Sequence, residues 1–249
     1  MNIHKLFNEW NKVTDTDHFS EEQIAQLIHL IKLILLDEYE SFYIIDYSQK
    51  RFVYVHDNPL FLCGHSAHEV LDMGYKFYDR YVHPEDIPFL FEVNEIGFRK
   101  YRELSEEDRN KDGYISYDFR IKNRNSYFPI RHTLIPLIKN ERQEIIWALC
   151  KVSLTDQKHS NMIMAKVGEK EILWNRKTKC WDEMPSPQLS EKEKEIVRLS
   201  VQGFTEKEMS ENLQLSESAI KKRKKILFQK LHVKNMSEAI ICCTNKKLF

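Results

Sequence analysis

The sequence predicts two domains of different class, an α+β domain with one antiparallel sheet followed by a small domain built of helices. Short aromatic and β-branched runs separated by turn residues recur after the first helix, and such runs are typical of strands. The final part of the chain instead carries a series of helix-capping signals. Between the two patterns lies Met184-Pro185-Ser186-Pro187, where proline disfavours helix and a linker is expected.

Residues 1–39 are expected to form an N-terminal helical segment, with its helix at 20–38. Ser20 and Gln23 match a capping box. Apolar residues then follow at helical spacing, namely Ile24, Leu27, Ile28, Ile31, Ile34 and Leu35. Such a stripe either packs only on the domain that follows or also pairs with a second copy of itself, and the sequence leaves both open.

Residues 40–155 are predicted to form the α+β domain, with a five-stranded antiparallel sheet and flanking helices. Two strand-like runs come first, short helices follow between Pro59 and Tyr101, and three further runs close the domain. The five runs are Phe42–Tyr47, Phe52–His56, Tyr114–Lys122, Tyr127–Ile138 and Ile145–Leu154. Residues 156–188 are expected to form a small β extension and a linker.

Residues 189–249 are predicted to form an all-α domain of four helices, at 190–202, 205–213, 216–231 and 235–246. Capping-box pairs open three of them, namely Ser190 with Glu193, Thr205 with Glu208 and Asn235 with Glu238. Ser216 caps the remaining helix, and Gly203 stands where a C′ glycine belongs. Only Gln214 and Leu215 separate the second helix from the third, a tight turn typical of a helix-turn-helix.

The third of these helices is strongly basic. It contains five consecutive cations, Lys221 to Lys225, in a chain whose 38 basic and 38 acidic residues balance. After Ser218 the sequence has a single acid, Glu238, so the helix lacks the acids that a merely solvated helix carries at i,i+4 spacing. A neutral chain that is basic at one end favours a polyanionic partner, and we expect double-stranded DNA.

The apolar positions of this helix predict which side faces the partner. Ile220, Leu227 and Leu231 share one face, which we expect to pack on Ile196, Leu199, Met209 and Leu213. The outward residues are then Glu217, Ser218, Lys221, Lys222 and Lys225. Because an α-helix fits the major groove, outward residues in its N-terminal half reach base edges or neighbouring phosphates.

One long pattern runs through the four predicted helices. It comprises Leu189-Ser190-x-Lys192-Glu193-Lys194-Glu195-Ile196-Val197, Gly203-x-Thr205-x-Lys207-Glu208-Met209, Leu215-Ser216, Ile220-Lys221, Lys230-Leu231-x-Val233-x-Asn235 and Ser237-Glu238-Ala239. With it, residues 189–240 closely resemble the LuxR-type (NarL/FixJ-like) helix-turn-helix. The resemblance implies that the third helix is the recognition helix with Lys221 as its basic contact. It also implies that Lys207 lies near the DNA backbone and that the fourth helix dimerises.

The sequence departs from this family at several positions. Ala219 stands where threonine is usual, Arg223 where histidine is, Ile226 where asparagine is, His232 replaces glycine and Met236 replaces arginine. Without the threonine and asparagine side chains, the helix loses two hydrogen-bonding partners for phosphate. Lys222, Lys224 and Lys225 are expected to attract phosphate by charge instead, so DNA binding should depend strongly on salt. The candidate DNA-binding residues are Lys207, Ser216, Glu217, Ser218, Lys221, Lys222, Lys224 and Lys225.

Three segments of the first domain match another family. They are Phe52-Val53-Tyr54-Val55-His56-Asp57-Asn58, Leu62-x-Gly64-His65-Ser66-x-x-Glu69-Val70-Leu71, and Val82-His83-Pro84-Glu85-Asp86 preceded by Phe77. On these, residues 40–155 resemble a PAS domain. The resemblance implies a sensory pocket for an unknown small molecule between sheet and helices, or a surface for dimerisation and signalling. An autoinducer-type ligand domain, also α+β, is the alternative.

No cofactor and no metal are expected. Cys63 in Phe61-Leu62-Cys63-Gly64 does not match the motif of flavin-binding light sensors, and the five cysteines include no Cys-x-x-Cys pair. The available haem ligands, His56, His65, His68 and His83, each have a simpler explanation at a surface or a helix start. The aromatic residues are expected in the core before a pocket, namely Tyr43, Phe52, Tyr54, Phe61, Phe77, Phe89, Phe91, Phe119 and Trp147.

The sequence therefore favours a DNA-binding transcriptional regulator, homodimeric on DNA, in which a PAS-like domain controls a LuxR-type helix-turn-helix. RNA polymerase is a further candidate partner. The alternative outside this class is an interaction module whose basic helix binds an acidic protein. An enzyme is not expected, because Glu85, Asp86 and His83 with Cys63 are accompanied by no phosphate loop, nucleophile elbow or metal-ligand set.

The same sequence predicts a cytoplasmic protein. No apolar run approaches the ~20 residues that a membrane span needs. The N-terminus lacks the apolar core of a signal peptide. The signal, the operator and the sign of regulation cannot be predicted from the residues.

Overall fold

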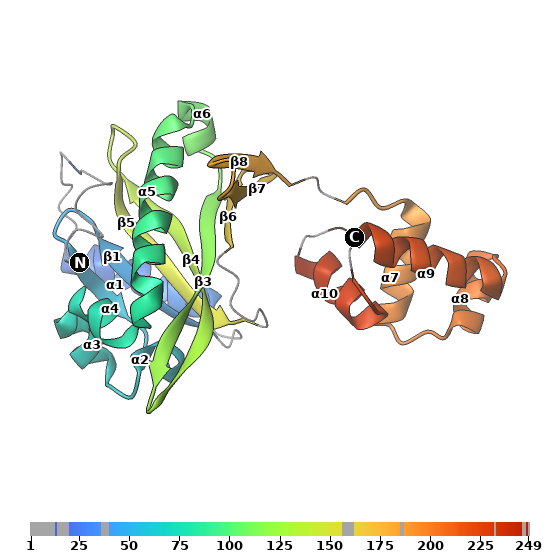
Figure 1. Ribbon diagram of the computed structural model, residues 1–249, viewed down its shortest axis with the longest axis horizontal. Coiled ribbons are helices and arrows are strands. Elements are labelled where there is room, and N and C mark those ends of the chain that lie inside the picture. The colour runs from blue at the N-terminus through green and yellow to red at the C-terminus, as the bar shows by residue number, and fades with distance from the viewer. Residues whose placement is uncertain are drawn as a thin grey trace. The chain divides into compact units, whose positions relative to one another are not determined.

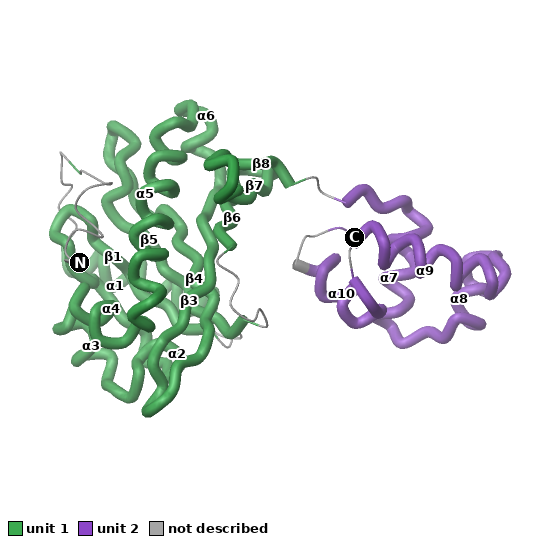
Figure 2. Tube along the Cα trace, in the orientation of Figure 1, with its two compact units in different colours: residues 1–184 green, residues 185–249 purple. Residues whose placement is uncertain are grey.

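A computed structural model describes residues 13, 20–35, 40–155, 162–184, 187–231, 233–245 and 248. The chain divides into two compact units, residues 1–184 and 185–249, which Figure 2 shows in separate colours. The first contains an antiparallel sheet with helices, and the described part of the second contains helices alone (Figure 1). The predicted combination of an antiparallel sheet domain and a helical C-terminal domain is confirmed.

The sheet of the first unit has eight antiparallel strands in the order β2-β1-β5-β4-β3-β6-β7-β8. In chain order the strands are β1 (Ser41–Asp46), β2 (Arg51–Val55), β3 (Gly113–Asn123), β4 (Ser126–Lys139), β5 (Ile145–Leu154), β6 (Ile163–Val167), β7 (Lys170–Asn175) and β8 (Cys180–Glu183). The first hairpin joins the later strands through β1 and β5, where Tyr43 lies opposite Cys150. The five predicted strands are therefore all present.

The prediction of a five-stranded sheet is wrong, because β6, β7 and β8 extend the same sheet. β6 pairs along the edge of β3, from Gly113 opposite Val167 to Tyr117 opposite Ile163. An open sheet edge presents unpaired amides and carbonyls, and a strand that follows in the chain can satisfy them. Gly113 permits the close approach, since a Cβ there would lie 2.7 Å from the Lys166 carbonyl oxygen.

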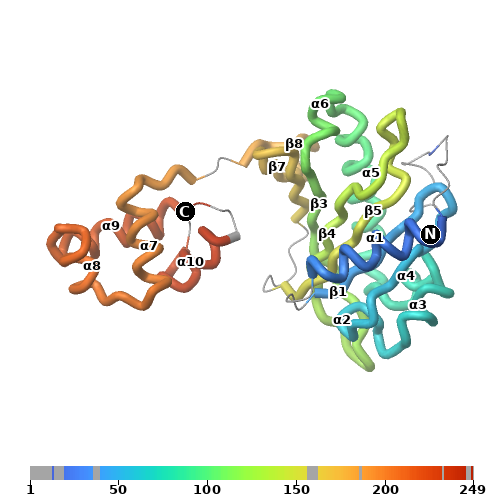
Figure 3. The backbone as a smooth tube through the Cα atoms, turned by 180° about the vertical axis from the view of Figure 1, so that it is seen from behind, coloured from blue at the N-terminus to red at the C-terminus, as the bar shows by residue number. Residues whose placement is uncertain are grey.

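Helices cover both faces of the sheet, as the opposite views in Figures 1 and 3 show. One face carries the helices between β2 and β3, and α1 crosses the other. The helices are α1 (Glu21–Ile34), α2 (Pro59–Leu62), α3 (Ala67–Met73), α4 (Lys76–Tyr81), the 3-10 turn η2 (Pro84–Asp86), α5 (Ile87–Glu103) and α6 (Glu106–Arg109). The capping boxes predicted at Ser20 and Ser66 are both formed. Residues 36–38 of the first predicted helix lie outside the described residues.

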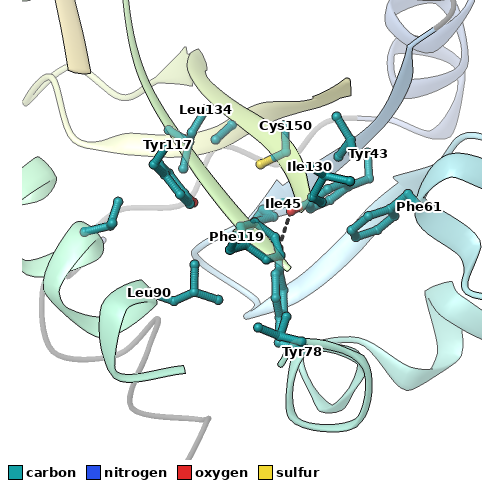
Figure 4. Packing of buried hydrophobic residues seen from close by; sticks show 14 of the residues in the cluster. Tyr43, Ile45, Phe61, Tyr78, Leu90, Tyr117, Phe119, Ile130, Leu134 and Cys150 are labelled. Carbon is teal, nitrogen blue, oxygen red and sulfur yellow. Dashed lines mark hydrogen bonds between the residues drawn. The ribbon is translucent and has the colours of Figure 1, made fainter. Parts of the chain in front are cut away.

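The sheet separates two apolar layers. Neighbouring residues of β1 point to opposite faces, and Phe42, Tyr43, Ile44 and Ile45 are all buried. On one side Tyr43 and Ile45 pack with residues of α2 to α5 (Figure 4). On the other side Phe42, Ile44 and Trp147 pack under Ile31 and its neighbours on α1.

Two expectations can be compared with these layers, whereas pairing of α1 with a second copy stays a prediction. The stripe of α1 packs on its own domain through Ile24, Leu27, Ile28, Ile31 and Leu35, whereas Ile34 is 79% exposed. Among the aromatic residues considered together, Trp147 and Tyr54 belong to the layer under α1. They therefore lie across the sheet from Tyr43, Phe61 and Phe119. The nine aromatic residues named from the sequence thus do not line a single pocket.

A small polar group lies within the inner layer. The Tyr43 hydroxyl hydrogen-bonds the Tyr78 hydroxyl (Figure 4) and lies 2.6 Å from His132 Nε2. His132 is 1% exposed, and burial lowers the pKa of its imidazole to about 3, so the ring is neutral at physiological pH. Its Nδ1 atom is buried without a hydrogen-bond partner among the described residues.

The His83-Pro84-Glu85-Asp86 segment has a structural role. Asp86 is 4% exposed and accepts hydrogen bonds from Arg120 at its backbone amide (2.7 Å), Nε (3.0 Å) and Nη2 (2.8 Å). Glu85 accepts from the same guanidinium at 2.9 Å. The two carboxylates thus attach η2 to β3. In the same domain, burial raises the pKa of the Cys63 thiol to about 12, so this thiol is protonated at neutral pH.

We predict that the first unit loses stability as the pH falls below about 6.5, the ordinary pKa of histidine. The unfolded chain then binds a proton on His132, whereas the folded chain does so only near pH 3. Because the unfolded state holds the additional proton, unfolding becomes more favourable by about 2 kcal/mol between pH 7 and pH 5. Denaturant unfolding followed by tryptophan fluorescence measures this, since all four tryptophans precede residue 185.

His132→Gln isolates this contribution from the other histidines. The variant is expected to be less stable at both pH values, but its loss between pH 7 and pH 5 should be smaller by about 2 kcal/mol. An identical pH dependence of the two proteins would show that His132 does not titrate as its burial implies.

Candidate nucleic-acid interface

The second unit is built from α7 (Glu191–Val201), α8 (Glu206–Leu213), α9 (Glu217–Leu231) and α10 (Met236–Asn245). The four predicted helices are present, and residue 246 lies outside the described residues. Ser190 and Thr205 form the predicted capping boxes with Glu193 and Glu208. Asn235 caps the Glu238 amide, but the Glu238 carboxylate reaches the Lys234 amide and the Asn235 side chain.

The turn between α8 and α9 is tight. Gln214 has a φ of 52°, in the left-handed region, and the Leu215 amide donates to the Ser210 carbonyl at 3.0 Å. Ser216 then caps α9 by accepting from the Ala219 amide at 3.2 Å. Partly buried Leu215 packs with the cluster that contains Met209 and Ile220, so the turn itself contributes to the core. This short connection fixes the start of α9 against α8.

The predicted inward face of α9 is confirmed, because Ile220, Leu227 and Leu231 are 0%, 1% and 6% exposed. Their packing partners differ from the expectation for two of them. Ile220 contacts the cluster of Ile196, Leu199 and Met209. Leu227 and Leu231 belong to a second cluster, completed by Val197, Ala239 and Cys243. Helix α9 is thus held along its length, by α8 at its start and by α10 farther on.

An ion pair also fixes the last turn of α9. Glu193, which is 4% exposed, accepts from the Ser190 amide at 2.7 Å and from Lys230 Nζ at 2.8 Å. Burial alone would raise the pKa of Glu193, but the Lys230 and Ser190 hydrogen bonds hold it below its usual value. The Glu193 carboxylate therefore caps α7 and holds α9. Sequence reasoning found the cap but missed Lys230, which lies 37 residues away.

The outward face of α9 carries the predicted cations. Exposed side chains at 218, 221, 222 and 225 follow helical spacing along one side of the helix. We call Ser218, Lys221, Lys222 and Lys225 the basic face. Lys222 and Lys225 form no ion pair with any described residue, and the same holds for exposed Lys207 on α8. Ser216 and Glu217 are also exposed at the first turn of α9.

Lys224 differs from the other candidates. Its side chain is only 20% exposed, and its Nζ donates to Glu206 Oε1 of α8 at 2.9 Å. Lys221 Nζ lies 3.8 Å from the other carboxylate oxygen of Glu206, while the Lys221 side chain is 66% exposed. Sequence reasoning missed Glu206, because it precedes Lys224 by 18 residues and only the turn between α8 and α9 brings them together. Contact of the candidate residues with DNA stays a prediction.

Other kinds of site receive no support from this geometry. Among the described residues, no group of three or more His, Cys, Asp and Glu is placed to hold a metal ion. No described helix is both long enough and apolar enough to cross a bilayer.

Several solved structures are similar over most of the chain, at low identity. The phage VqmA–DPO complex is 13% identical and covers 91% of this chain and 90% of its own, with a TM-score of 0.31. A Vibrio cholerae VqmA dimer without target DNA is 13% identical, with coverages of 93% and 89% and a TM-score of 0.28. Escherichia coli SdiA is 14% identical, with coverages of 93% and 92% and a TM-score of 0.27.

Sequence comparison assigns the second unit. No curated protein sequence matches the chain. Residues 187–243 match the family described as bacterial regulatory proteins, luxR family. That match spans α7, α8, α9 and most of α10, including the tight turn and the basic face. Residues 187–243 are therefore a LuxR-type helix-turn-helix domain.

Proposed function

We propose that the protein is a DNA-binding transcriptional regulator in which a PAS-like N-terminal domain controls the helix-turn-helix. The observation that carries this proposal is the basic face of α9, presented outward by a LuxR-type domain. Its buried side leaves the helix no other orientation within that domain. Helix α9 would then enter the major groove with Lys221, Lys222 and Lys225 toward the DNA.

The chemistry of this face favours phosphate over base contacts. A lysine ammonium is a compact charge on a flexible stem, and it binds phosphate without reading sequence unless it meets a guanine edge. Partly buried Ala219 and 37% exposed Ile226 offer no hydrogen-bonding side chain on α9. The affinity for DNA is accordingly expected to fall steeply with salt concentration.

The PAS-like assignment of the N-terminal domain is supported by its order of elements. Strands β1 and β2 come first in the chain, a run of helices follows, and β3, β4 and β5 come last. These five strands are consecutive in the sheet, in the order β2-β1-β5-β4-β3. Within that layer the hydroxyls of Tyr43 and Tyr78 and the neutral imidazole of His132 supply polar groups. A small molecule with hydrogen-bonding groups is the class of signal that such an interior would recognise.

We further propose that the regulator is a homodimer through the outer face of α1. Leu30, Leu33 and Ile34 are 56%, 50% and 79% exposed there, although the opposite side of the helix packs on the sheet. They recur at i, i+3 and i+4 and form a short apolar stripe, which a second copy of α1 would cover. Figure 3 shows α1 crossing the face of the sheet that is turned toward the viewer.

Substitution of single lysines tests the DNA interface. Lys221→Ala and Lys225→Ala should each weaken binding to any duplex and lower the slope of log affinity against log salt by about one, because each removes a phosphate contact. Fluorescence anisotropy with a labelled duplex, between about 50 and 200 mM salt, measures both quantities.

Lys170→Ala is a matched control, since it removes an exposed lysine from the first unit. It should leave affinity and slope unchanged, and circular dichroism should show native helix content in all variants. Wild-type protein that binds no duplex, or that binds independently of salt, would contradict the proposed function. Normal binding by both α9 variants would instead show that another surface meets the DNA.

Dimerisation is tested by placing a charge on the outer face of α1. Leu30→Glu should weaken self-association by about tenfold or more, because a dimer would bury an unpaired carboxylate. Ala25→Glu adds the same charge at an exposed position off the stripe and should not change it. Sedimentation equilibrium across a concentration series measures the difference. Equal effects of the two variants, or a monomeric wild type, would exclude this dimer interface.

A further inference from the structure

Glu206 is placed between the two helices of the helix-turn-helix. It is the first residue of α8, and its carboxylate faces α9, where it meets two cations of the basic run. Lys224 Nζ donates to Oε1 at 2.9 Å, and Lys221 Nζ lies 3.8 Å from Oε2. Among the described residues, Glu206 is the acid that forms ion pairs with the run Lys221 to Lys225.

The two pairs are not equivalent. The Lys224 side chain is 20% exposed and makes a hydrogen bond of ordinary length, so its ammonium group is paired with Glu206 within the domain. The Lys221 side chain is 66% exposed and lies beyond hydrogen-bond length, so its ammonium group can leave Glu206 at little cost. The Lys224 hydrogen bond holds the pKa of Glu206 below its usual range, which keeps the carboxylate charged near neutral pH.

We propose that Glu206 competes with DNA phosphate for Lys221 and so sets the affinity of the domain for the DNA backbone. In the free protein the carboxylate holds Lys224 and attracts Lys221. On DNA a phosphate replaces it at Lys221, while the Lys224 pair remains. The carboxylate also repels the same phosphate, so binding is weaker than the lysines alone would give. This inference rests on the proposed DNA-binding function and adds to it an acid that opposes binding.

Removing the charge of Glu206 tests the competition. Glu206→Gln keeps the shape of the side chain and should tighten binding of the full-length protein to a duplex of arbitrary sequence by about 3- to 10-fold at low salt, with a steeper salt dependence. Glu211→Gln is the matched control, because it removes one exposed acid from the same helix and Glu211 forms no ion pair with a described residue. It should change the affinity by less than about twofold.

The competing explanation is that the Glu206–Lys224 pair only holds α8 against α9. Under that explanation Glu206→Gln and Lys224→Met break the same pair and both weaken binding. If Glu206 competes with phosphate, Glu206→Gln tightens DNA binding and Lys224→Met weakens it. Lys224→Met weakens binding because the Glu206 carboxylate then pairs with Lys221 alone and holds it away from phosphate. The gain from Glu206→Gln should also largely disappear in a Lys221→Ala background, because the phosphate contact that Glu206 opposes is then absent.

Each outcome decides the inference. Tighter binding by Glu206→Gln alone, dependent on Lys221, supports it. Salt-dependent binding by the wild type with unchanged or weaker binding by Glu206→Gln overturns it and leaves the proposed function intact. Equal tightening by Glu206→Gln and Glu211→Gln shows a general charge effect and also overturns it. If Glu206→Gln fails to fold by circular dichroism, the pair is structural and the inference is wrong. A wild type that binds no duplex removes the proposed function as well.

Discussion

The burial of one side of α9 is the constraint on which the rest of the second unit depends. Ile220, Leu227 and Leu231 occupy the small cores formed with α7, α8 and α10, and Glu193 holds the last turn through Lys230. Because that side of the helix is buried, the position of each cation in the run Lys221 to Lys225 determines whether its side chain faces solvent or another helix. Lys221, Lys222 and Lys225 reach solvent, whereas Lys224 turns toward α8. A charge run in the sequence becomes a directed surface only through this packing.

In the first unit, burial of β1 on both faces has a comparable effect. Because its side chains alternate, it supports the inner layer around Tyr43 and the outer layer under α1 with the same six residues, Ser41–Asp46. The polar group at Tyr43 and His132 therefore lies on one face, and the buried side of α1 covers the other, with Leu30, Leu33 and Ile34 exposed on the far side of that helix. Strands β1 and β5 each contribute residues to both layers, so they connect the inner polar group with the layer under α1.

Local features were predictable from sequence, and long-range pairings were not. Capping boxes, the apolar positions of α9 and the strand positions depend on neighbours within a few residues, and each was found from residue spacing. The eight-stranded sheet was missed because alternation locates a strand without identifying its partner, so β6 could not be assigned to the edge of β3. The same limit hid Glu193–Lys230 and Glu206–Lys224, whose members lie on different helices. His132 lies between Ile130 and Leu134 on the buried face of β4, but its polar side chain does not identify it as a core residue in the sequence.

The division of roles on α9 also restricts how sequence preference can arise. Ser216 is occupied as the cap of the helix, and its hydroxyl lies 2.9 Å from that of Ser218. Beyond the first turn, the basic face has only the ammonium groups of Lys221, Lys222 and Lys225. The neighbouring residues Ala219 and Ile226 are apolar. In the proposed complex with DNA, exposed Glu217 at the first turn would be the carboxylate acceptor, to which a cytosine amino group would donate. Under the proposed function, backbone affinity and base discrimination therefore fall to different turns of the same helix.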